Sequence, residues 1–269
     1  MSTPSLSTKL APPARPIASA DGPIRAVTFD LWATLIEGHQ RGSAARDVVR
    51  SNALTHALHR NGSLVDHQRV QEVMSLEATR WERVWRERWV TLRNPERVAW
   101  MLQQLELPAL SAALTADVCR AFDESLWEAP PEPNPGAREA LQSLKNMGVE
   151  LAVISDTSYS TGKMLRKLLE RYHLLEFFDC LTFSDEVGIS KPNAEMFLAT
   201  LRALRVGPAF AVHVGDNPFT DVFGANEAGL RSVAFGSPCD EATWNVEALS
   251  ELPALLKPLV AARLSPLSR

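Results

Sequence analysis

The chain has 269 residues, 45% of them hydrophobic, so it can bury a full core without disulfides or a structural metal. A formal net charge of −4 argues against nucleic acid or an anionic membrane as a partner and favours a small molecule. Three widely spaced cysteines give no disulfide framework or zinc pattern, and no apolar run reaches the roughly 20 residues that cross a bilayer, so we expect a cytoplasmic protein.

The chain begins with a segment rich in proline, serine, threonine and alanine that lacks the apolar stretch of a secretory signal, which predicts a disordered tail over residues 1–23. A short β-prone run then stops at Asp30, and similar runs recur in the second half of the sequence. The predicted strands are residues 26–29, 151–154, 181–183, 211–214 and 232–235.

Helical patterns separate the later strands, at residues 162–172, 194–204 and 221–228. Strands that alternate with helices indicate a doubly wound, Rossmann-like parallel sheet, and therefore an α/β fold. The interval between the first two strands is far too long for one crossover and reads mostly as helix, so we expect an inserted all-helical cap domain over residues 37–131. The α/β core domain then comprises residues 24–36 and 132–269.

Polar side chains follow the predicted strands directly. Asp30 follows the first strand and Ser155 the second, while Asp216 follows the fourth, with Asp221 shortly after it. Lys191 lies in the connection after the third strand. Because ligands bind at the carboxyl ends of the strands in an open parallel sheet, we expect these groups to form one site.

The segments that carry these residues resemble the four ordered motifs of the haloacid dehalogenase-like hydrolases. Order, spacing and strand context all match, and the resemblance covers about residues 25–235. The motifs read FDLWATL, VISDTSYSTG, SDEVGISKPNAEMF and HVGDNPFTDVFGANEAGL. The resemblance implies an enzyme, most simply a phosphatase that acts on a small phosphorylated molecule.

By this resemblance, Asp30 is the nucleophile that attacks phosphorus and becomes an aspartyl-phosphate, which water then hydrolyses. Ser155 would donate a hydrogen bond to a phosphoryl oxygen, and Lys191 would neutralise the negative charge of the nucleophile and of the transferred group.

The resemblance also implies a magnesium ion. It would bind Asp30, the backbone carbonyl of Trp32 and Asp216, with Asp221 as a further ligand or as a partner of the ligands. Several carboxylates in one small pocket repel one another unless they are protonated or bridged by a cation, which agrees independently with Mg²⁺.

Trp32 departs from the pattern of the family's phosphatases, which usually have a second aspartate two residues after the nucleophile. That aspartate protonates the leaving group, and an indole cannot, so another residue, a substrate group, a water or a stable leaving group must compensate. An aromatic residue here also resembles the metal-free dehalogenases, which lack the acidic residues seen at Asp216 and Asp221. A dehalogenase acting on 2-haloacids, or a catalytically weakened binding protein, therefore remains an alternative.

Trp81, Trp85 and Trp89 recur at every fourth position and predict one helical stripe in the cap. This pattern is typical of a core-facing stripe, or of a cap surface that closes over the substrate with Arg86 nearby. The residues that we expect to contact the substrate are Trp32, Trp85, Arg86 and Asp156, the last at a position where the family commonly has asparagine. We expect a monomer or a homodimer.

Overall fold

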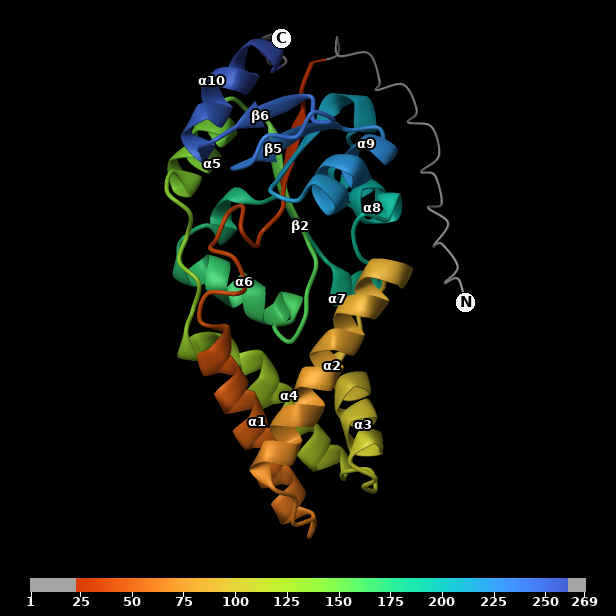
Figure 1. Ribbon diagram of the computed structural model, residues 1–269. Coiled ribbons are helices and arrows are strands. Elements are labelled where there is room, and N and C mark those ends of the chain that lie inside the picture. The colour runs from red at the N-terminus through yellow and green to blue at the C-terminus, as the bar shows by residue number, and fades with distance from the viewer. Residues whose placement is uncertain (1–22, 261–269) are drawn as a thin grey trace, which may run out of the picture.

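The computed structural model describes residues 23–260, which form a six-stranded parallel sheet with helices on both faces (Figure 1). The strand order is β3-β2-β1-β4-β5-β6. The strands are β1 (Ala26–Phe29), β2 (Glu150–Ser155), β3 (Cys180–Phe183), β4 (Ala211–Gly215), β5 (Arg231–Phe235) and β6 (Trp244–Val246). The α/β prediction is confirmed, and only the short edge strand β6 was not predicted. The predicted tail lies outside the described residues, apart from Pro23.

Alternate side chains of β1 build two separate cores. Val27 and Phe29 pack toward one face, where α5 (Ala137–Asn146), α6 (Gly162–Arg171) and α10 (Leu252–Leu256) lie. Ala26 packs toward the other face, against α8 (Ala194–Leu204) and α9 (Gly224–Glu227). All four residues of β1 are buried, as expected for a central parallel strand that is covered on both faces.

Short elements complete this part of the chain. The helix that follows β4 begins earlier than residues 221–228, because Pro218 opens it and the Asn217 side chain accepts hydrogen bonds from the backbone of Phe219 and Thr220. The remaining short helices are α7 (Ser184–Val187), the π-helix η4 (Pro218–Phe223) and the 3₁₀ helices η1 (Ser125–Glu128), η2 (Leu175–Phe177), η3 (Pro208–Phe210), η5 (Leu249–Glu251) and η6 (Lys257–Leu259).

Four long helices form a separate bundle below the carboxyl ends of the strands (Figure 1). They are α1 (Ser43–Arg60), α2 (His67–Arg88), α3 (Asn94–Gln104) and α4 (Ala112–Glu124). The bundle has its own buried core, which includes Leu54, Val73, Met101 and Phe122. All four helices lie inside the predicted cap, residues 37–131, whose boundaries remain a prediction. We use the name cap for this bundle.

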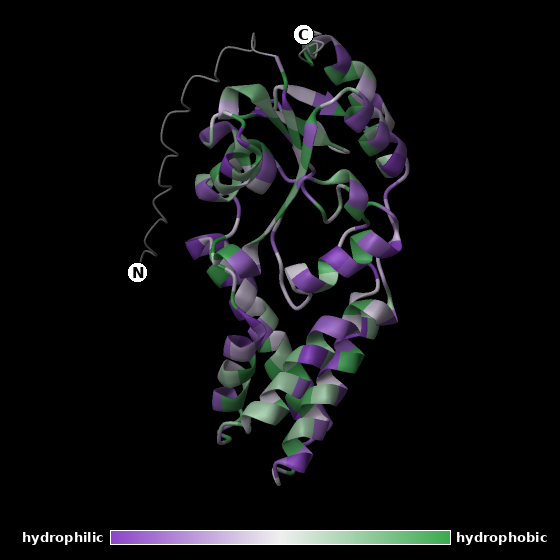
Figure 2. Cartoon of the chain, turned by 180° about the vertical axis from the view of Figure 1, so that it is seen from behind, coloured by the Kyte–Doolittle hydropathy of each residue, from purple (hydrophilic) through white to green (hydrophobic). Residues whose placement is uncertain are grey.

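Hydrophilic and hydrophobic residues alternate along the cap helices, and the strands of the sheet are mostly hydrophobic (Figure 2). Helix α2 ends at Arg88, because Trp89 adopts a left-handed backbone with φ of 54°. The predicted tryptophan stripe is therefore wrong at Trp89, which leaves the helix.

Of the described helices, none is long and apolar enough to cross a membrane.

Candidate active site

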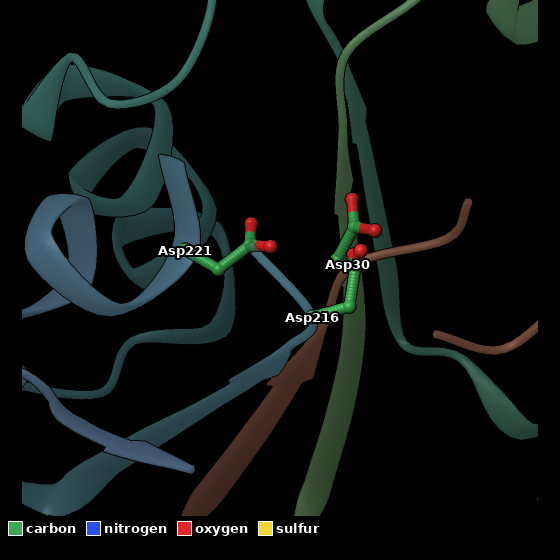
Figure 3. A group of neighbouring side chains, drawn as sticks. All are labelled: Asp30, Asp216 and Asp221. Atoms are coloured by element: carbon green, nitrogen blue, oxygen red, sulfur yellow. The ribbon is translucent and has the colours of Figure 1, made fainter. Parts of the chain in front are cut away.

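Three aspartates converge at the carboxyl ends of the two central strands. Asp30 follows β1 directly, Asp216 follows β4, and Asp221 lies one turn farther along, in η4. Each offers a carboxylate oxygen, and these atoms lie within 4.8 Å of one another. Figure 3 shows the three side chains pointing toward a common space. The parallel arrangement of β1 and β4 therefore brings together residues that are almost 190 positions apart in sequence.

Lys191 inserts its ammonium between two of these carboxylates. Its Nζ lies 2.5 Å from Asp30 Oδ1 and 2.6 Å from Asp221 Oδ1, and its side chain is 2% exposed. Burial alone would lower the pKa of Lys191, but Asp221 and Asp30 raise it above its ordinary value. The lysine therefore stays charged, and three carboxylates with one ammonium leave two negative charges uncompensated when all of them are ionised.

The pKa values of the three carboxyl groups differ because their partners differ. Burial, together with repulsion from Asp221 and Asp216, raises the pKa of Asp30 well above its ordinary range, although Lys191 opposes this. Burial and Asp221 raise the pKa of Asp216 to about 6. Burial would also raise the pKa of Asp221, but Lys191 and His213 hold it well below its ordinary value. Of these three carboxyl groups, Asp221 therefore stays ionised to the lowest pH.

Both oxygens of Asp221 are already engaged by the protein. Oδ1 lies near Lys191 Nζ and 3.4 Å from His213 Nε2, and Oδ2 accepts a hydrogen bond from the Asn217 backbone at 3.0 Å. Gly215 makes room for this carboxylate, since a Cβ there would lie 2.3 Å from Asp221 Cγ. These contacts favour a role for Asp221 in holding Lys191 over direct coordination of a metal.

Asp30 and Asp216 retain free acceptor capacity. Within residues 23–260, no hydrogen-bond donor is found for Asp30 Oδ2, and the hydrogen bond of Asp216 is a long one of 3.4 Å from the Thr34 hydroxyl. Magnesium prefers such hard carboxylate oxygens and balances two negative charges. The free carboxylate oxygens of Asp30 and Asp216 therefore have the chemistry that a magnesium ion requires.

Ser155 and Asp156 end β2 beside this group. Ser155 is fully buried, and its hydroxyl donates to the backbone oxygen of Asp156 at 3.1 Å. Asp156 Oδ1 accepts from the Lys191 backbone at 3.0 Å, and Oδ2 accepts from the indole nitrogen of Trp85 at 2.9 Å. Burial raises the pKa of Asp156 to about 6. The structure thus brings Ser155, Asp156, Lys191 and the cap residue Trp85 together.

The remaining predicted contacts lie at the rim. Trp32 is half-buried in the turn after β1, with its ring edge-on to His39 at 6.4 Å between centroids. Trp85 stacks on Trp81 at 5.8 Å. Arg86 is exposed and pairs with Glu82 on the same helix, so the structure does not bring it to the aspartates. Substrate contact by these residues remains a prediction.

His213, on β4, lies beside the site but was not among the residues predicted from the sequence. The ring is buried edge-on against Phe197, shares a hydrogen bond with the Thr28 hydroxyl at 2.9 Å, and faces Asp221. Thr34, which donates to Asp216, was also missed. The sequence offers only the alternation of side chains between the two faces of β4, which does not show which residue His213 contacts.

Comparisons with known proteins identify the family of the chain. The sequence pattern of the haloacid dehalogenase-like hydrolases matches residues 24–229. The chain is 28% identical over 213 residues to the glyceraldehyde 3-phosphate phosphatase of Pyrococcus abyssi, which covers 79% of this chain and 81% of that protein.

Solved structures share the fold at lower identity. A HAD phosphatase from Thermococcus onnurineus superposes with a TM-score of 0.58 at 21% identity, covering 87% of this chain and 98% of that one. A 2-haloacid dehalogenase from Pseudomonas syringae superposes with a TM-score of 0.61 at 23% identity, covering 87% and 99%. The same fold thus occurs in a phosphatase and in a dehalogenase, and does not distinguish the two reactions. The family match over residues 24–229 includes all three aspartates and Lys191. The chain belongs to the haloacid dehalogenase-like hydrolases, a family of enzymes.

Proposed function

We propose that this enzyme hydrolyses a phosphate monoester of a small molecule, using magnesium and a phosphorylated Asp30. One observation carries the proposal: three carboxylates lie within 4.8 Å of one another, with a single lysine to balance them. A site with two uncompensated negative charges is suited to a divalent cation and, with that cation bound, to a phosphoryl group.

A phosphatase explains this site better than a dehalogenase does. Displacement of a halide needs one carboxylate nucleophile, and further carboxylates near it only raise its pKa and weaken it as an anion. Here Asp216 and Asp221 both raise the pKa of Asp30. A bound cation lowers the pKa of Asp30 again. Asp216 would therefore help a metal-dependent reaction by binding the cation, whereas in a metal-free reaction it would only weaken the nucleophile. The similarity to a glyceraldehyde 3-phosphate phosphatase supports the same choice.

The reaction proceeds in two displacements. An oxygen of Asp30 attacks phosphorus, the bond between phosphorus and the leaving oxygen breaks, and an aspartyl-phosphate forms. The leaving oxygen departs as an anion and takes a proton from solvent. Water then attacks the same phosphorus and loses a proton to solvent, the bond to Asp30 breaks, and inorganic phosphate leaves. Lys191 keeps one oxygen of Asp30 in place and offsets negative charge, while the Ser155 hydroxyl turns from the Asp156 backbone to a phosphoryl oxygen.

Magnesium, held by Asp30, Asp216 and the backbone carbonyl of Trp32, would neutralise charge on the phosphoryl oxygens. Asp221 keeps Lys191 charged and fixed, because both of its oxygens are bound within the protein.

The absence of an acid at Trp32 sets the preferred leaving group. Loss of a general acid typically costs about 10² to 10⁴ in rate, and the cost falls on leaving groups that need a proton. We therefore expect aryl phosphates, whose leaving groups are stable as anions, to react faster than alkyl phosphates.

Phosphate release from an aryl phosphate, assayed with magnesium and with chelator, tests the proposal. We expect turnover with magnesium and none with chelator. Halide release from a 2-haloacid that persists in chelator would instead establish the dehalogenase, and no turnover of either kind would favour the weakened binding protein.

A further inference from the structure

The loop after β2, residues 156–161, is bound by the cap at successive positions. Its contacts come from α2, α3 and α4, so it joins all three helices to the strand that carries Ser155. The contacts are Trp85 Nε1 to Asp156 Oδ2 (2.9 Å), Arg97 Nη1 to Ser158 Oγ (2.9 Å), Asn94 Nδ2 to the Tyr159 backbone oxygen (2.9 Å) and the Thr161 backbone to Asp123 Oδ1 (2.8 Å).

Asp156 differs from the other contacts because it also touches the catalytic lysine. One of its oxygens accepts the indole N–H of Trp85, and the other accepts the backbone N–H of Lys191. The Lys191 ammonium lies 2.5 Å from the nucleophile. A continuous path of three hydrogen bonds therefore leads from the cap, through Asp156 and the Lys191 backbone, to Asp30.

The segment that precedes Lys191 is also bound by the chain that directly follows α2. The Trp89 backbone oxygen accepts from the Ser190 backbone at 2.8 Å. The Thr91 hydroxyl donates to Ser184 Oγ at 2.6 Å and shares a hydrogen bond with Ser190 Oγ at 2.8 Å. Residues 85–91 thus hold the backbone of Ser190 and, through Asp156, the backbone N–H of Lys191.

The geometry points to Trp85 as a positioning residue: its indole N–H, through the Asp156 carboxylate, holds the Lys191 backbone so that the ammonium reaches Asp30 when the end of α2 is docked. The inference rests on the proposed function for its catalytic consequence, but not for its structural one. A displacement of about 1 Å in a catalytic group can cost on the order of 10² in rate, so a group outside the reaction can control it.

A carboxylate is required at position 156, because both of its neighbours are donors. An asparagine presents one acceptor oxygen and one donor NH₂. Whichever way its amide is turned, the NH₂ faces either the Trp85 N–H or the Lys191 N–H. One bond is lost, and two donors are forced together.

Trp85→Phe and Trp81→Phe form a matched pair of variants. The two tryptophans lie on one helix and stack at 5.8 Å, so either phenylalanine keeps an aromatic ring in the stack. Trp81 Nε1 has no hydrogen-bond partner among the described residues, so replacing the indole with a phenyl ring breaks no hydrogen bond there. We expect Trp85→Phe to lower kcat on an aryl phosphate about tenfold with little change in KM, and Trp81→Phe to leave both unchanged.

Asp156→Asn, made alone and with Trp85→Phe, tests the path. We expect Asp156→Asn to lower kcat at least as much as Trp85→Phe. The double variant should be no worse than Trp85→Phe alone, because removing the indole lets the asparagine oxygen accept from Lys191 without a facing donor. Losses that multiply would show that the two residues act independently and would overturn the inference.

Amide hydrogen exchange of the segment around Ser190 and Lys191, measured without substrate, separates this inference from the proposed function. We expect exchange there to be about tenfold faster in Trp85→Phe and unchanged in Trp81→Phe. If wild-type turnover is absent, the proposed function fails while this comparison still decides the positioning. Equal exchange in both variants and wild type overturns the positioning even in an active phosphatase.

Discussion

Lys191→Met removes the one cation that separates Asp30 from Asp221. The lysine is 2% exposed and lies 2.5 and 2.6 Å from the two carboxylates, so its loss leaves buried negative charge without a partner. Removing one partner of a buried ion pair typically costs about 3 to 5 kcal/mol. We therefore expect metal-free Lys191→Met to unfold with a midpoint roughly 6 to 20 °C lower at pH 8, at about 2 to 4 °C per kcal/mol.

The loss should shrink at lower pH. The pKa of Asp30 is already raised in the folded wild type, and removal of the lysine raises it further. A carboxyl group whose folded pKa is raised destabilises the fold above that pKa and ceases to do so as the pH falls through it. At pH 5, protonation should therefore relieve the repulsion, and magnesium should relieve part of it at pH 8.

Thermal unfolding at pH 5 and pH 8, with and without magnesium, measures these effects. Lys167→Met is the matched control, because Lys167 lies exposed on α6. A midpoint for Lys191→Met that equals the control, or a loss that grows at pH 5, would refute the charge balance described for the site.

Three further predictions address the metal, the glycine and the missing acid. Magnesium affinity, measured by calorimetry, should fall at least about tenfold between pH 7 and pH 5, because protonation of Asp216, with its pKa of about 6, and of Asp30, whose pKa is also raised, competes with the metal; a flat profile would exclude Asp216 as a ligand. Gly215→Ala should cost more than about 2 kcal/mol of unfolding free energy and most of the activity, since the new Cβ would lie 2.3 Å from Asp221 Cγ. Gly38→Ala, with 3.7 Å of space, should cost little, and equal losses would contradict the packing argument. Trp32→Asp should raise the ratio of kcat/KM for alkyl over aryl phosphates at least tenfold, and a folded variant with no gain would mean that another group already supplies the proton.

The sheet and the aspartate group were readable from the sequence, because each depends on one local rule. Apolar runs predicted β1, β2 and β4, and the residues that follow such runs must meet at one edge of a parallel sheet. Asp30 and Asp216 therefore needed no knowledge of the cap. The edge strand β6 was missed because three residues, two of them partly or fully exposed, give no periodic signal.

The contact between Trp85 and Asp156 was not readable, since it depends on how the cap docks. The two residues are separated by 71 positions, and a tryptophan at helical spacing is compatible with a packed core as well as with a rim. The departure of Trp89 from the helix likewise depends on docking, because its backbone oxygen accepts from Ser190 in the core. Contacts between residues that are far apart in the sequence cannot be predicted from the pattern of a short segment.

The measurement that tests the account most directly is magnesium-dependent phosphate release from an aryl phosphate by Asp30→Asn, beside wild type and the exposed control Asp240→Asn. Circular dichroism and a cooperative unfolding transition should show that both variants are folded. We predict turnover by wild type and Asp240→Asn and none by Asp30→Asn. Turnover by a folded Asp30→Asn would contradict the assignment of Asp30 as the nucleophile.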